Sequence, residues 1–167
     1  MSIEKEMQFF YRMEKCFKES GFDSAILGRS VPKLIVTLPD DDKGRKQQVS
    51  FTFLDLSNFQ EINWVKCLRF QFEYPFKAEQ KIKLYRILNT INQQMIAGFL
   101  FFEENKLCFR YTYYLSDIDK LSNDWFLESV FFTIMLSQIY SELIEGVASE
   151  KVAEQKALNI IKELLEG

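Results

Sequence analysis

The most restrictive feature of the sequence is the absence of histidine from all 167 residues. Histidine is the commonest general base in enzymes and a frequent metal ligand. Carboxylate pairs do occur, at Glu103-Glu104 and at Asp117-Asp119, but both lie in polar stretches typical of turns and loops. Carboxylates in such stretches are normally solvated. The residue types therefore predict a protein that is not an enzyme, with no catalytic residue, no metal ligand and no bound cofactor.

The three cysteines, Cys16, Cys67 and Cys108, are far apart and form neither a CxxC pair nor a zinc spacing. An odd number of dispersed cysteines indicates reduced thiols in a reducing compartment. A cysteine nucleophile usually needs a neighbouring base. Lysine or tyrosine could still act as a base, so a pocket without a recognisable motif remains an alternative.

The charge balance argues against a nucleic-acid partner. Lys and Arg number 21 and Asp and Glu number 24, which gives a formal net charge of -3. Nucleic-acid-binding proteins usually carry a basic stripe that neutralises phosphates. The most basic stretch, Lys43-Gly44-Arg45-Lys46, directly follows three aspartates at 40–42. We expect this stretch to be a solvated hairpin tip.

The distribution of charges also bears on location. Glu4, Lys5 and Glu6 interrupt the first residues, so these do not resemble the apolar core of a signal peptide. The most apolar segment, residues 125–144, contains charged and polar side chains throughout. It does not resemble a membrane span, which needs about 20 apolar residues. We expect a cytoplasmic protein without a membrane partner.

The elements that would position any site follow from hydrophobic periodicity. Leu68, Phe70 and Phe72 alternate with polar residues, and Phe109, Tyr111 and Tyr113 do the same, as half-buried strands require. Strands are predicted over 33–38, 48–56, 65–76, 97–102 and 107–115, and helices over 3–20, 78–95, 124–147 and 150–165. This order, α-β-β-β-α-β-β-α-α, predicts an α+β fold with a mainly antiparallel five-stranded sheet and flanking helices. Residues 1–147 would form one domain, and residues 148–167 an amphipathic helix packed on it or on a dimer mate.

The late helices carry more apolar residues than one sheet face can cover. The predicted helix over 124–147 is apolar around much of its circumference, and such a helix must be covered on more than one side. A large exposed apolar patch is rare in monomers, so we expect a partner protein or a second copy, as a homodimer. The alternative is a monomer with a larger core. The residues predicted to form this partner or dimer surface are Trp125, Phe126, Phe131, Met135, Leu158, Ile161 and Leu165.

Four short motifs resemble a known family. They are Leu68-Arg69-Phe70-Gln71-Phe72-Glu73-Tyr74-Pro75-Phe76, Leu88-Asn89-x-Ile91-Asn92, Gly98-Phe99-x-Phe101 and Leu107-Cys108-Phe109-Arg110-Tyr111-Thr112. In this order they resemble the YbjN-type domain, a bacterial family labelled as sensory transduction regulators. The resemblance implies a fold similar to the type III secretion chaperones, which are often dimeric and hold an extended client segment along apolar grooves. It assigns no catalytic residue.

The residues and the resemblance together predict a non-enzymatic protein-binding module, chaperone-like or regulatory. Such a module would hold a partner segment on an apolar groove or on a sheet edge. The alternative is a regulator that senses a small ligand, or an enzyme, in each case with a pocket that no motif reveals.

Overall fold

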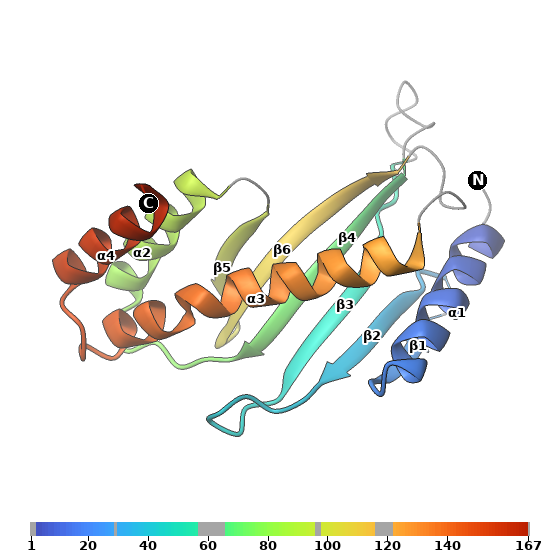
Figure 1. Ribbon diagram of the computed structural model, residues 1–167, viewed down its shortest axis with the longest axis horizontal. Coiled ribbons are helices and arrows are strands. Elements are labelled where there is room, and N and C mark those ends of the chain that lie inside the picture. The colour runs from blue at the N-terminus through green and yellow to red at the C-terminus, as the bar shows by residue number, and fades with distance from the viewer. Residues whose placement is uncertain (1–2, 29, 57–65, 96–97, 116–121, 167) are drawn as a thin grey trace.

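A computed structural model describes residues 3–28, 30–56, 66–95, 98–115 and 122–166. The described residues form a mixed α+β fold built on one antiparallel sheet (Figure 1). Among them, no helix combines the length and the apolar character that crossing a membrane would require. The predicted pair Asp117-Asp119 lies outside the described residues.

The sheet has six strands in the order β1-β2-β3-β4-β6-β5, each antiparallel to its neighbours. Its long centre is β4 paired with β6, with Phe70 opposite Tyr111 and Phe72 opposite Phe109. The strands are β1 (Asp23–Leu27), β2 (Lys33–Leu38), β3 (Gln47–Phe53), β4 (Lys66–Pro75), β5 (Phe99–Glu103) and β6 (Lys106–Leu115).

The prediction of five strands was wrong by one, because β1 was missed. Its five residues, Asp23–Leu27, are too few to show a clear alternation, and they lie at the edge of the sheet. Gly21 and Gly28 flank the strand with φ values of 85° and 81°, which turn the chain into and out of it. The observed order is therefore α-β-β-β-β-α-β-β-α-α.

The described helices gather on one face of the sheet and beside one edge. In Figure 1, α3 (Asn123–Ala148) crosses in front of the sheet, α1 (Ile3–Glu19) lies over β1 and β2, and α2 (Lys81–Gln94) and α4 (Glu154–Glu166) lie beside β5. The opposite face carries mostly polar side chains and no described helix covers it. We call it the open face.

Aromatic rings join the helices to the covered face. Phe126 of α3 is fully buried, with its ring centroid 5.2 Å from that of Phe51 and 5.7 Å from that of Phe9. Phe17 of α1 stacks on Phe51 at 5.8 Å. The high phenylalanine content therefore serves the core, in which edge-to-face and tilted ring pairs add to the apolar burial.

The last helix packs on its own chain. α4 contacts α2 and α3, and its Ala157 and Ile161 are buried. The turn that leads to it is tight, because the Val152 amide donates to the Gly146 carbonyl at 2.9 Å. A Cβ at Gly146 would lie 2.5 Å from the side chain of Val152. Glycine at this position thus lets α4 return to α3 and α2.

Phe72 tests the assignment of faces. Its side chain is fully buried at the centre of the covered face, so Phe72→Ala should leave a cavity and lower the free energy of unfolding by about 3–5 kcal/mol. Phe99→Ala, on the open face and 43% exposed, is the matched control and should cost less than about 1 kcal/mol. Urea unfolding monitored by circular dichroism measures both. Equal midpoint shifts would contradict the assignment.

A side chain occupies the outward backbone groups of Leu100 on the outer edge of β5. The Asn92 amide donates to the Leu100 carbonyl at 2.8 Å, and its oxygen accepts from the Leu100 amide at 2.7 Å. Asn92 thus bonds the backbone of the neighbouring strand and not that at the end of its own helix. Glycine is needed at position 98 because β6 passes closely: a Cβ there would lie 2.6 Å from the Arg110 carbonyl.

Asn92→Ala should therefore destabilise the protein, because both backbone groups of Leu100 would lose their partner. The expected loss is about 1–3 kcal/mol of unfolding free energy. Asn89→Ala is the control, since Asn89 is exposed and should be replaceable without a measurable change. Hydrogen exchange at the Leu100 amide provides a second readout, which should accelerate only in Asn92→Ala. Unchanged protection of that amide would contradict the role of Asn92.

Candidate functional site

The outward side of α3 carries an exposed apolar ridge. Trp125, Phe132, Met135 and Ile139 are 52%, 56%, 50% and 49% exposed. They are separated by seven, three and four residues, so they fall on one side of the helix. We call these four residues the α3 ridge. Ridges with this spacing are typical of helices that pack on another helix or along a groove.

The structure divides the residues predicted to form a partner surface. Trp125, Phe131 and Met135 are exposed on α3, whereas Phe126 and Ile161 are buried within the chain. Leu158 is half-buried against the core, and with Ile161 it lines a smaller pocket of about 460 Å³ between α2 and α4. The side chain of Leu165 lies outside the described residues.

Sequence reasoning missed two members of the ridge, Phe132 and Ile139. The heptad-like spacing of Trp125, Phe132 and Ile139 was a usable signal, because residues seven apart share a helix side. It was obscured because the opposite side, with Phe126, Val130 and Ile134, is equally apolar. Periodicity alone does not say which of two apolar sides meets the sheet.

A cleft of about 730 Å³ lies beside the ridge, between α3 and the loop that joins β2 to β3. Its apolar walls come from Phe22, Leu38, Pro39, Phe131, Ile134 and Ile139. The rings of Phe22 and Phe131 contact each other as a tilted pair, with centroids 5.4 Å apart. Because Ile139 belongs to both the ridge and the cleft, the two surfaces are continuous.

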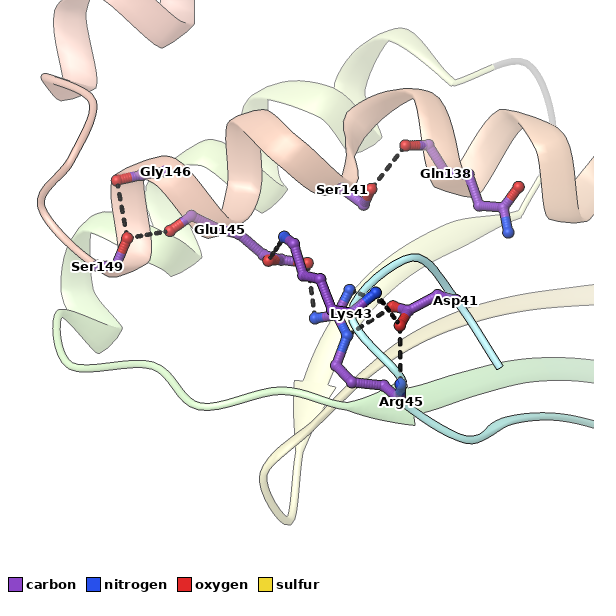
Figure 2. A network of polar contacts seen from close by, with 8 residues as sticks. All are labelled: Asp41, Lys43, Arg45, Gln138, Ser141, Glu145, Gly146 and Ser149. Atoms are coloured by element: carbon purple, nitrogen blue, oxygen red, sulfur yellow. Dashed lines mark hydrogen bonds and ion pairs between the residues drawn. The ribbon is translucent and has the colours of Figure 1, made fainter. Parts of the chain in front are cut away.

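Ion pairs hold the β2–β3 loop against α3 (Figure 2). Arg45 bridges Asp41 of its own loop, at 2.5 Å, and Glu145 of α3, at 2.7 Å. Lys43 also pairs with Glu145. The expectation of a solvated hairpin tip is therefore corrected: Lys43 and Arg45 dock on a helix that is about a hundred residues later in the chain.

The same contacts set the protonation of the loop. Burial alone would raise the pKa of Asp41, but hydrogen bonds from the Arg45 side chain and from the Arg45 and Lys43 amides outweigh it and lower that pKa. Desolvation would lower the pKa of Arg45, but Asp41 and Glu145 raise it. Both groups are therefore charged across the neutral range, which keeps the loop docked.

Tyr74 adds a polar group to the lining of the cleft. Its side chain is 3% exposed, and its hydroxyl is shielded from solvent beside Ser141 of α3. Burial raises the pKa of this hydroxyl. The Arg45 guanidinium lies over its ring, 4.6 Å from the centroid. Tyr74 thus keeps a protonated hydroxyl that the surrounding side chains shield from the open part of the cleft.

The rim of the cleft and ridge is acidic. Asp40, Asp42 and Glu142 line the cleft, and Glu128 is exposed on α3. These four carboxylates form no ion pair with another described residue, whereas Asp41 and Glu145 do. An apolar surface with uncompensated negative charge around it suits a ligand that is apolar on one side and basic at its flanks.

The described residues contain no group of three or more cysteine and carboxylate side chains that could hold a metal ion. The chemistry available at the ridge and the cleft is thus apolar burial and attraction of cations. A comparison with protein-family models finds no match, and a comparison with curated proteins finds none either.

The loop contacts predict a specific change in titration. Arg45→Gln removes the cation that stabilises ionised Asp41, so the pKa of Asp41 should rise toward its ordinary value. Ionised Asp41 stabilises the fold at any pH above the pKa that this carboxyl has in the unfolded chain. This contribution disappears as the pH falls through the lower pKa of the folded state. The wild type should therefore lose it only under acid conditions, below about pH 4.

Carboxyl carbon chemical shifts measured against pH give the Asp41 pKa in each variant. Arg86→Gln is the matched control, because Arg86 pairs with Glu154 on the other helices and should leave Asp41 unchanged. An equal Asp41 pKa in the wild type and in Arg45→Gln would contradict the proposed docking.

Proposed function

We propose that the chain is a non-enzymatic protein-binding module, chaperone-like or regulatory, that holds an amphipathic segment of a partner protein on the α3 ridge and in the adjoining cleft. The observation that carries this proposal is the continuity of the exposed apolar ridge with an apolar cleft through Ile139. Exposed contiguous apolar surface with a polar rim is characteristic of interaction sites.

The chemistry of the partner follows from the charges. The partner segment would bury apolar side chains against Phe132, Met135 and Ile139 and place Lys or Arg beside the uncompensated carboxylates. Charge complementarity of this kind accelerates association and excludes acidic competitors. A segment with apolar residues at helical spacing and basic flanks meets these requirements.

A second copy of the chain fits this surface less well. Glu128 and Glu142 lie seven residues before and after Met135. Two antiparallel α3 helices related by a two-fold axis at Met135 would bring Glu128 of one chain beside Glu142 of the other. Like charges placed together disfavour such pairing. The homodimer expected from the sequence stays a prediction, which the experiment below also tests.

One observation favours the alternative of a small-ligand regulator. The cleft, which Tyr74 lines, has a volume within the range of small-molecule sites. A ligand that packs on Phe22 and Phe131 in this cleft would dock without using Trp125, Phe132 or Met135 of the ridge. The resemblance to the YbjN-type family and to the type III secretion chaperones agrees with a binding or regulatory role and stays part of the proposal.

Calorimetric titration with two synthetic helical peptides tests the proposal, one of leucine and lysine and the other of leucine and glutamate, of equal length. We expect only the lysine peptide to bind. Ile139→Gln should weaken its affinity about tenfold, because a buried isoleucine contact is lost. Ile82→Gln is the matched control, since Ile82 is 72% exposed on α2, and it should bind as the wild type does.

Equal effects of Ile139→Gln and Ile82→Gln would contradict a site at the ridge. Light scattering on the same samples distinguishes a second copy as the occupant. A dimer in the wild type that dissociates in Ile139→Gln would assign the ridge to self-association and overturn the choice of a basic partner. Equal binding of both peptides would contradict the preference for a basic partner segment.

A further inference from the structure

The open face of the sheet holds two neighbouring arginines without a carboxylate partner. Arg69 of β4 and Arg110 of β6 are diagonal neighbours, because the register places Arg69 opposite Thr112 and Gln71 opposite Arg110. Diagonal neighbours on one sheet face are within reach of long side chains. Two like charges are thus held close together on a rigid surface.

The contacts of both guanidiniums leave their charge uncompensated. Arg69 makes no hydrogen bond or ion pair with the residues that the structure describes, and its Nε is shielded from solvent without an acceptor. Arg110 donates through Nε and Nη2 to the neutral amide oxygen of Gln71, at 3.2 Å and 2.8 Å. Glu73, farther along β4, is occupied by Lys106 at 2.8 Å.

Holding these two arginines together lowers the stability of the fold, and a bound anion would offset that loss. Desolvation, together with the charge of Arg110, lowers the pKa of Arg69. A shielded Nε without an acceptor is also unfavourable. Arginine presents a planar fork of donors that matches phosphate oxygens, and charge-assisted hydrogen bonds of this kind are strong.

Two aromatic rings lie on the same face beside the arginines. Phe99 and Phe101 of β5 have ring centroids 5.6 Å apart, and Phe99 is 43% exposed. The Arg110 guanidinium carbon lies 4.4 Å from the centroid of Phe101 and 5.8 Å from that of Phe99. We call these two rings the aromatic shelf. Exposed aromatic rings on an open antiparallel sheet are surfaces on which nucleobases stack.

We propose that the open face binds a nucleotide, with its phosphate on Arg69 and Arg110 and its base on the aromatic shelf. The guanidinium pair supplies the charge, Thr112 opposite Arg69 adds a hydroxyl, and Phe99 supplies an accessible ring. The formal net charge of -3 favours a mononucleotide over a long strand, because a strand would be repelled by the rest of the molecule. This site is separate from the α3 ridge and does not depend on the function proposed for it.

The test uses calorimetric titration of the whole chain with inorganic phosphate, AMP and a short oligoadenylate. We expect phosphate to bind weakly and AMP more tightly. Arg69→Gln and Arg110→Gln should each weaken AMP binding by about tenfold, as the loss of charge-assisted hydrogen bonds implies. Arg86→Gln removes the same charge from α2, where Arg86 pairs with Glu154, and should have no effect.

Phe99→Leu separates the two halves of the site, because it should weaken AMP binding and leave phosphate binding unchanged. Circular dichroism and urea unfolding establish that each variant is folded, and Arg69→Gln should not be less stable than the wild type, since a like charge is removed. If the affinity per site is higher for AMP than for oligoadenylate, the ligand is a free nucleotide. If the affinity is higher for oligoadenylate, the same site binds a strand. Absence of AMP binding at millimolar concentration, or equal affinity in the wild type and both arginine variants, would overturn the proposal.

Discussion

The packing of α3 and α1 against one face of the sheet is the constraint on which the other features depend. Phe51 of β3 lies at its centre, in contact with Phe17 of α1, Phe126 of α3 and Phe70 of the neighbouring strand. Because the described helices use only this face and one edge, every strand must divide its side chains between an apolar and a polar environment. The apolar ridge and the open face are what remains outside this packing, so the two proposed binding surfaces lie on opposite sides of the molecule.

The parts of the fold that follow from local periodicity could be predicted from the sequence. The alternation around Phe70 and Phe72 located β4 and its covered face, and the helical periodicity located all the described helices to within a few residues. β1 was missed because Asp23–Leu27 pairs with one neighbour only and is too short for a pattern to emerge. β1 forms because it pairs with β2, and no local sequence signal encodes that pairing.

The candidate site was predictable only in part, for a different reason. The sequence located an excess of apolar side chains on residues 124–147. An α-helix with two apolar sides does not reveal which side is covered. For this reason Phe126 was predicted on the partner surface and Phe132 was not. The docking of Lys43 and Arg45 on Glu145 joins residues far apart in the chain. Neither the cleft nor the unpaired arginines of the open face could be inferred without knowing which strands are neighbours.

The two edges of the sheet differ in a way that limits how copies of this chain can aggregate. Asn92 occupies the hydrogen-bonding groups of Leu100 on β5, whereas β1 at the far edge pairs only with β2 among the described strands. A fibre that grows by adding sheet to sheet needs two receptive edges per molecule, so that each copy both accepts and offers a strand. Among the described residues, Asn92 takes the outward backbone groups of Leu100 from one edge, which leaves β1 as the more receptive edge. Pairing through the β5 edge is therefore disfavoured, and an asparagine side chain provides this protection where other sheets use charges or proline.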